Sequence, residues 1–212
     1  MNIRFKKMNG QNNFLATADK RKLKHSATES SSIPEKIDFI TPTVMSVLEF
    51  FLNDPMKEYY GREVSRKTNV SVGSANKILR LLTELDFLTQ ERKGKMLIYK
   101  LNLKEPTVKQ FKILISIFSL KKLVGELKPD SRRVVLFGSC SQGTDTKESD
   151  IDMLIITAEK EPVRKIINEF NRKQERHIAP IVVDMNEFIR LKNEDKPLYE
   201  NIDRGIVLWE AE

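Results

Sequence analysis

Two aspartates that alternate at the start of an apolar run constrain this chain more than any other feature. Asp150 and Asp152 lead into the apolar residues 153–156. In an extended strand, side chains at positions i and i+2 leave the same face, with their Cα atoms roughly 6 to 7 Å apart. Two carboxylates on one face repel each other, and a divalent cation between them would relieve this repulsion. Carboxylate oxygens favour Mg²⁺ or Mn²⁺ over zinc, and the chain has only one cysteine and two histidines.

A glycine and a serine follow the preceding apolar run, residues 134–137, which is short and rich in valine. Gly138 has no side chain to block a ligand, so the backbone can approach it closely. The Ser139 hydroxyl and the N–H groups after it can bind phosphate oxygens. No Gly-Lys-Ser/Thr sequence follows, which excludes a P-loop. The pattern therefore predicts two strands that enclose a phosphate-binding turn.

The combined pattern resembles the minimal nucleotidyltransferases of the DNA polymerase β superfamily. The positions that carry the resemblance are Gly138, Ser139, Gly143, Ser149, Asp150 and Asp152. The resemblance implies a small mixed sheet with flanking helices, two Mg²⁺ or Mn²⁺ ions held by the paired aspartates, and a triphosphate held by the glycine-serine turn. It also implies ATP as the expected substrate and transfer of a nucleoside monophosphate to a protein or nucleic-acid acceptor. In that mechanism one metal activates the attacking hydroxyl and the other neutralises the leaving pyrophosphate.

Active relatives in that superfamily use a third carboxylate on a neighbouring strand. The best candidate is Asp184, which follows the apolar run 178–183 and precedes a helix expected from about Met185. We therefore predict Asp184 as a third catalytic and metal-binding residue. The alternative is that Asp184 caps this helix, with Glu187 completing a capping box.

The first half of the chain predicts three helices followed by a hairpin. Thr41 and Ser71 are candidate N-caps, a helix is expected over 61–68, and two strand-like runs flank Gly94. This order resembles a winged helix-turn-helix over about residues 40–105. In that family the second helix of the motif enters the DNA major groove and the wing contacts phosphates. The resemblance implies base contacts and phosphate contacts from Ser74, Asn76, Lys77, Arg80, Arg92, Lys93 and Lys95.

Charge is divided unevenly along the chain. Residues 1–35 carry seven Lys or Arg against three acids, residues 36–105 carry twelve against nine, and residues 106–212 carry eighteen of each. A basic N-terminal half suggests double-stranded DNA as a partner of that half. The alternatives are a solvated basic surface, or a winged helix that serves dimerisation or protein docking.

We expect an α+β chain with four parts: a disordered basic tail (1–38), the winged helix-turn-helix (39–105), a connecting helix (106–128) and a small mixed-sheet nucleotidyltransferase domain with flanking helices (129–212). The connecting helix should carry an apolar face, which makes a homodimer plausible. Its expected apolar residues are Val108, Phe111, Leu114, Ile115 and Phe118. The last stretch, 197–209, predicts a helix, a glycine turn and a strand.

Two functions fit this pattern. The first is a Mg²⁺-dependent nucleotidyltransferase with a DNA-binding winged helix. The second is a DNA-binding transcriptional regulator or antitoxin whose nucleotidyltransferase domain is inactive or senses nucleotide. No apolar run reaches the roughly 18 to 20 residues of a membrane span, so we expect a cytoplasmic protein with no membrane partner. The single Cys140 is interpreted as a turn residue, because no histidine lies near it in the sequence.

Overall fold

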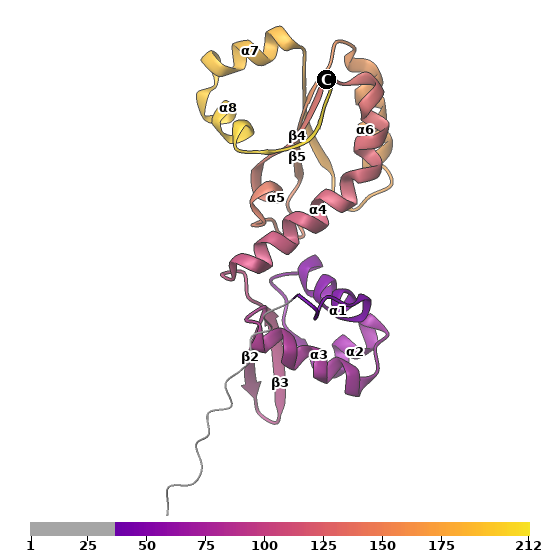
Figure 1. Cartoon of the computed structure of the whole chain (residues 1–212), viewed down its shortest axis with the longest axis vertical. Coiled ribbons are helices and arrows are strands. Elements are labelled where there is room, and N and C mark those ends of the chain that lie inside the picture. The colour runs from indigo at the N-terminus through magenta and orange to yellow at the C-terminus, as the bar shows by residue number, and fades with distance from the viewer. Residues whose placement is uncertain (1–36) are drawn as a thin grey trace, which may run out of the picture. The chain divides into compact units, whose positions relative to one another are not determined.

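A computed structural model describes residues 37–212, in which helices and strands follow the order shown in Figure 1. Most of the predicted basic tail, residues 1–36, lies outside the described residues. The first helix, α1 (Pro42–Asn53), begins after Thr41, whose side chain accepts a hydrogen bond from the N–H of Val44. Pro42 occupies the first turn, where its missing N–H is not needed. The predicted cap at Thr41 is confirmed.

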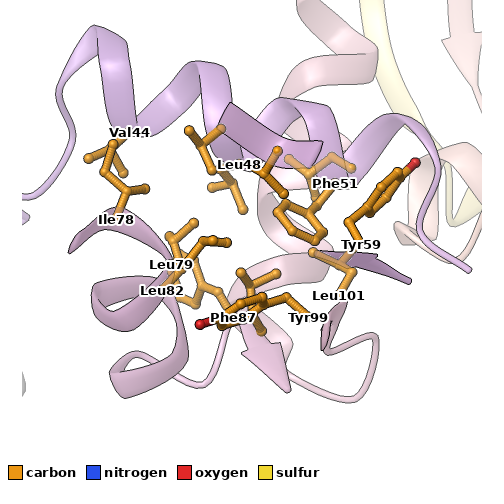
Figure 2. Close-up of a cluster of buried hydrophobic side chains, with 14 of the residues drawn as sticks. Val44, Leu48, Phe51, Tyr59, Ile78, Leu79, Leu82, Phe87, Tyr99 and Leu101 are labelled. Atoms are coloured by element: carbon orange, nitrogen blue, oxygen red, sulfur yellow. The ribbon is translucent and has the colours of Figure 1, made fainter. Parts of the chain in front are cut away.

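Two further helices follow α1 in the N-terminal part of the described chain. α2 (Gly61–Thr68) ends at Asn69, which adopts the left-handed conformation with φ 55°. α3 (Val72–Glu84) is capped by Ser71, as predicted. The apolar faces of the helices and the wing strands meet in one core (Figure 2). Its fully buried members include Val47, Leu48, Phe51, Val64, Leu79 and Leu82.

A three-stranded antiparallel sheet follows the helices. β2 (Leu88–Lys93) and β3 (Met96–Leu101) form the hairpin, and Gly94 takes a φ of 64° in its turn. β1 (Tyr59–Tyr60), which the sequence pattern did not predict, adds to the other side of β3. Three helices with this hairpin confirm the winged helix-turn-helix.

The helix α4 (Pro106–Leu127) contributes side chains to two cores. Its first half supplies Val108, Phe111 and Ile115 to the winged-helix core, and its second half supplies buried leucines to the next core. The predicted apolar face is only partly correct, because Leu114 is 43% exposed and Phe118 is 62% exposed. These two side chains lie on the face of α4 that neither core covers. A short 3₁₀ turn, Lys128–Asp130, follows the helix.

The C-terminal half is built on a four-stranded mixed sheet in the order β6-β5-β4-β7. β5 pairs antiparallel with β4 and parallel with β6, and β7 pairs antiparallel with β4. The strands are β4 (Arg133–Leu136), β5 (Ile151–Ile156), β6 (Ile178–Val183) and β7 (Ile206–Glu210). Together with the winged helix, this sheet confirms the predicted α+β class.

Helices cover both faces of this sheet (Figure 1). The alternation of side chains along β4 and β5 sends Leu136 and Met153 to one face, under α4 and α6. It sends Val135 and Leu154 to the other face, under α7 and α8. The helices of this half are α5 (Gly138–Gln142), α6 (Lys160–Asn171), α7 (Met185–Glu194) and α8 (Lys196–Asp203). Among the described residues, no helix is long and apolar enough to cross a membrane.

Candidate functional site

The carboxylate of Asp152 lies directly against the backbone of Gly138. The N–H of Phe137 donates to the carbonyl oxygen of Asp152 at 3.0 Å, which continues the ladder between β4 and β5 to this point. A β-carbon at position 138 would overlap Oδ2 of Asp152. Gly138 also has a φ of 68°, which favours glycine. The sheet therefore brings the predicted acid and the predicted phosphate-binding turn together.

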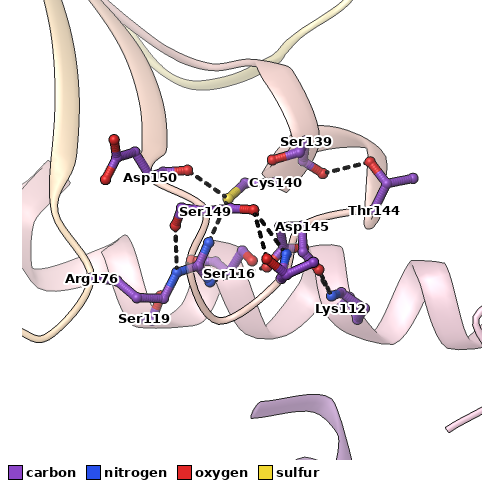
Figure 3. Close-up of polar contacts among 11 residues, drawn as sticks. Lys112, Ser116, Ser119, Ser139, Cys140, Thr144, Asp145, Ser149, Asp150 and Arg176 are labelled. Atoms are coloured by element: carbon purple, nitrogen blue, oxygen red, sulfur yellow. Dashed lines mark hydrogen bonds and ion pairs between the residues drawn. The ribbon is translucent and has the colours of Figure 1, made fainter. Parts of the chain in front are cut away.

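Asp150 lies one residue before β5, and its side chain is exposed. Its carboxylate points away from Cys140, whose thiol donates to the carbonyl oxygen of Asp150 (Figure 3). Burial, followed by the charge of Asp150, raises the pKa of the half-buried Asp152. Within residues 37–212, neither carboxylate forms an ion pair or a side-chain hydrogen bond. The pair is thus a region of uncompensated negative charge.

The oxygen donors of this acid pair are those that Mg²⁺ and Mn²⁺ prefer. Magnesium in phosphate-handling sites is usually held by one or two carboxylates and completed by substrate phosphates and water. The described residues contain no group of three or more His, Cys, Asp or Glu side chains that could enclose a metal alone. Water and a triphosphate would therefore supply the remaining oxygens.

The predicted turn after β4 is the short helix α5, which ends at Gly143 with a φ of 65°. The carbonyl oxygen of Ser139 accepts from the N–H of Thr144 at 3.0 Å and from its hydroxyl at 3.5 Å (Figure 3). In the described part of the chain, the hydroxyl of Ser139 itself has no hydrogen-bond partner. It remains available to a phosphate oxygen. Cys140 is fully buried beneath the turn, in agreement with its interpretation as a turn residue.

We predict that Gly138→Ala removes metal-dependent nucleotide binding. The added methyl group would displace the carboxylate of Asp152 and force alanine into the left-handed region. Isothermal titration with Mn²⁺ and a non-hydrolysable ATP analogue should show at least about a tenfold loss of affinity, since about 1.4 kcal/mol of strain suffices for a factor of ten. Gly125→Ala is the control, because a β-carbon at this helical position has no heavy atom within 4 Å. Equal affinities for both variants would contradict the placement of Asp152.

The prediction of Asp184 as a third metal ligand is not supported by the geometry. Asp152 is the register partner of Ala179 on β6, and Asp184 follows five residues later, roughly 16 Å further along a parallel strand. The carboxylate of Asp184 instead caps α7, with Glu187 completing a capping box. The hydrogen bond from the N–H of Glu187 lowers the pKa of Asp184. Asp184 is therefore corrected to a helix cap, the alternative that its spacing to Glu187 had left open.

The predicted DNA-contacting residues all lie on exposed surface of the winged helix. Ser74, Asn76, Lys77 and Arg80 are exposed on α3. Arg92, Lys93 and Lys95 are exposed on the hairpin, where Lys93 forms an ion pair of 2.7 Å with Glu58. Their role in binding remains a prediction.

The structure adds two arginines that the sequence pattern did not single out. Arg62 and Arg66 lie four residues apart on α2, and both line a surface concavity of about 960 Å³ together with Asn76 and Lys95. Their i, i+4 spacing places them on one helix face. The predicted helix over 61–68 contained this signal, but only the packing of α2 against α3 and the wing shows which side it faces.

A four-stranded mixed sheet that holds the carboxylate of Asp152 against a glycine-serine turn, with Asp150 just before the same strand, is the arrangement that the sequence pattern predicted for a nucleotidyltransferase-type domain. A family model described as "Nucleotidyltransferase domain" matches residues 119–207. The C-terminal half of the chain is a nucleotidyltransferase domain.

Three solved structures illustrate the similarity. A candidate nucleotidyltransferase from Sulfolobus solfataricus is 19% identical, with 49% of this chain and 87% of that chain covered and a TM-score of 0.34. A possible transcriptional regulator from Methanosarcina mazei Go1 is 20% identical, with 43% and 79% covered and a TM-score of 0.32. TrmBL2, an archaeal chromatin protein, is 14% identical, with 82% and 74% covered and a TM-score of 0.28. No curated protein sequence matches the chain. With TM-scores this low, the assignment depends on the domain match and on the geometry of the acid pair.

Proposed function

We propose that this chain is a Mg²⁺-dependent nucleotidyltransferase that transfers a nucleoside monophosphate, from ATP, to a protein or nucleic-acid acceptor, and that its winged helix binds double-stranded DNA. The observation that carries the proposal is the half-buried carboxylate of Asp152, held against Gly138 and close to Asp150 in the sequence, with no Lys or Arg among residues 37–212 paired to either acid. Burying an acid next to a like charge is unfavourable unless a cation binds there.

Each residue of the site has a distinct part in this proposal. Asp150 and Asp152 hold the metal ion, which supplies neutralisation of the charge on the triphosphate. The backbone at Gly138 leaves room for the phosphates, and the hydroxyl of Ser139 donates to one of their oxygens. The sheet holds Asp152 against Gly138 before the substrate binds, so that little reorganisation of these groups is needed during reaction.

The test is transfer of label from α-labelled triphosphates. The full chain is incubated with Mg²⁺ and each labelled triphosphate in turn, with and without duplex DNA and the products of neighbouring genes. We expect incorporation of label with ATP, in a reaction that EDTA abolishes. Failure of every triphosphate to bind or react in the presence of Mg²⁺ or Mn²⁺ would exclude the proposal.

A second candidate is a DNA-binding transcriptional regulator or antitoxin whose transferase domain senses nucleotide without transferring it. It is favoured by the composition of β6, where no residue from Ile178 to Val183 is acidic and Ala179 lies beside Asp152. Tight binding of duplex DNA and of Mg²⁺-ATP without transfer would identify this function. In that case Ala179→Asp, which adds a carboxylate next to Asp152, provides a direct test of whether a missing acid is the cause.

A further inference from the structure

Three charged side chains, two of them almost fully buried, meet at the loop that leads to Asp150. The loop runs from Gly143 to Asp150 without regular structure, yet Asp145 in its middle is only 6% exposed. Two cations meet this carboxylate from different parts of the chain (Figure 3). Lys112 of α4 lies 3.2 Å from Oδ1, and Arg176, just before β6, lies 3.0 Å from Oδ2.

Arg176 binds the loop at two points and helix α5 at a third. Besides Asp145, its guanidinium donates from Nε to the carbonyl oxygen of Ser149 at 3.1 Å and from a terminal nitrogen to the sulfur of Cys140 at 3.1 Å. The planar fork of arginine allows one side chain to fix several acceptors in a set geometry. One arginine thereby ties the middle of the loop, the residue before Asp150 and the helix α5 to one another.

Helix α4 supplies the support on the opposite side. Lys112 is 4% exposed, and its ammonium group also donates to the backbone carbonyl of Asp145. The backbone of the same helix lies directly against the start of the loop, since a β-carbon at Gly143 would overlap the carbonyl oxygen of Lys109. The loop is therefore held by contacts with α4 and by contacts with Arg176.

Stability alone does not account for this arrangement. Lys112 and Asp145 are almost fully buried and Arg176 is partly exposed, and the desolvation penalty of buried charges often equals or exceeds their mutual attraction. Asp152 is held by the sheet ladder, whereas Asp150 precedes the strand and takes its position from the loop. The contacts of Lys112 and Arg176 fix the loop, and the loop leads directly to Asp150.

We propose that Lys112, Asp145 and Arg176 are positioning residues that place Asp150 relative to Asp152 for binding of the metal. This inference rests on the proposed function, because it assumes that the two aspartates share a cation. None of the three residues needs to touch the metal or the nucleotide. Their effect passes through Ser149 and the loop to the carboxylate of Asp150.

The test compares Arg176→Met with Arg172→Met in the full chain. Arg172 is an exposed arginine at the end of α6, so its replacement makes the same change of charge away from the cluster. Binding of Mn²⁺ is measured by electron paramagnetic resonance, without and with a non-hydrolysable ATP analogue, well below the unfolding temperature. We expect Arg176→Met to weaken Mn²⁺ binding at least tenfold and Arg172→Met to leave it unchanged. Arg176→Lys, which keeps the charge but loses the fork, should restore little of the affinity.

A double variant separates positioning from stability. Lys112→Met alone leaves the carboxylate of Asp145 with one cation fewer in a buried site, and is expected to lower the unfolding temperature. Lys112→Met with Asp145→Leu removes both charges and should recover the unfolding temperature while Mn²⁺ binding stays weak.

Wild-type Mn²⁺ affinity in Arg176→Met, or in the double variant, would overturn the positioning role and leave the proposed function intact. No Mn²⁺ binding by the wild-type chain, with or without the analogue, would overturn both.

Discussion

Asp152→Asn is expected to lower nucleotidyl transfer by about a thousandfold while raising the unfolding temperature at neutral pH. The loss follows from the several kcal/mol that a bound metal contributes to the stabilisation of transition-state charge, at about 1.4 kcal/mol for each factor of ten. The gain in stability follows from removing a half-buried charge that Asp150 repels. A residue whose neutral replacement stabilises the fold and abolishes activity is present for its function.

The same substitution should change how stability depends on pH. Burial and Asp150 raise the pKa of Asp152 in the folded chain, so the folded state binds this proton more tightly than the unfolded state. Asp152 therefore destabilises the fold progressively as the pH rises from the ordinary carboxyl pKa through the raised one. Asp152→Asn should lack this decrease, which thermal unfolding between pH 3 and pH 7 in EDTA would reveal.

Asp203→Asn is the matched control for these measurements, because Asp203 is exposed at the end of α8. It should leave transfer unchanged. Addition of Mg²⁺ at pH 7 should stabilise the wild-type chain and not Asp152→Asn. A variant at position 152 that retains full transfer would show that the acid pair is not the metal site.

The double variant Lys77→Glu and Arg80→Glu is expected to weaken binding to duplex DNA about a hundredfold at low salt. Both side chains are exposed on α3, the second helix of the motif. Loss of a base contact by arginine costs about 1 to 3 kcal/mol, and reversal of each charge adds repulsion from the phosphates. The slope of log affinity against log salt should also fall by about 2, as expected when two cations no longer displace counterions.

Fluorescence anisotropy over a range of salt concentrations measures both quantities. Lys165→Glu with Arg172→Glu makes the same change of charge on α6, where both side chains are exposed, and should leave DNA binding unchanged. Equal losses from the two double variants would indicate nonspecific attraction by total charge. Loss from neither would favour a winged helix that docks protein.

Local signals in the sequence predicted most of the helices and strands correctly. The caps at Thr41 and Ser71 and the apolar stripe of α3 depend on neighbours within four residues. The glycine-serine turn and the alternating aspartates are equally local. β1 was missed because two residues carry no periodicity, and they form a strand only by pairing with Tyr99 and Ile98.

The exposed apolar side chains of α4 show that the spacing of apolar residues does not by itself predict which of them are buried. Spacing placed Leu114 and Phe118 on the apolar face with Val108 and Phe111, but a helix of 22 residues turns its faces toward more than one neighbour. Which of those faces is covered depends on elements distant in the sequence.

The position of Asp184 depends on the direction in which β6 pairs with β5. Its spacing from an apolar run suited both a metal ligand and a helix cap, and the sequence contains no signal that separates them. Because β6 runs parallel to β5, Asp184 at the end of β6 lies at the opposite end of the strands from Asp150 and Asp152, which lie at the start of β5. The pairing of the strands therefore places Asp184 away from the acid pair.

The sequence by itself determined the two domain types, the acid pair and the glycine-serine turn that we predict to bind phosphate, since each depends on residues close together in the chain. Only the tertiary structure joined Lys112, Asp145 and Arg176, which are separated by 33 and 31 positions. It also placed Arg62, Arg66 and Lys95 around one surface concavity. The physical reason is that short-range spacing follows from the geometry of one helix or strand, whereas these contacts arise only when separate elements pack and bury their apolar faces.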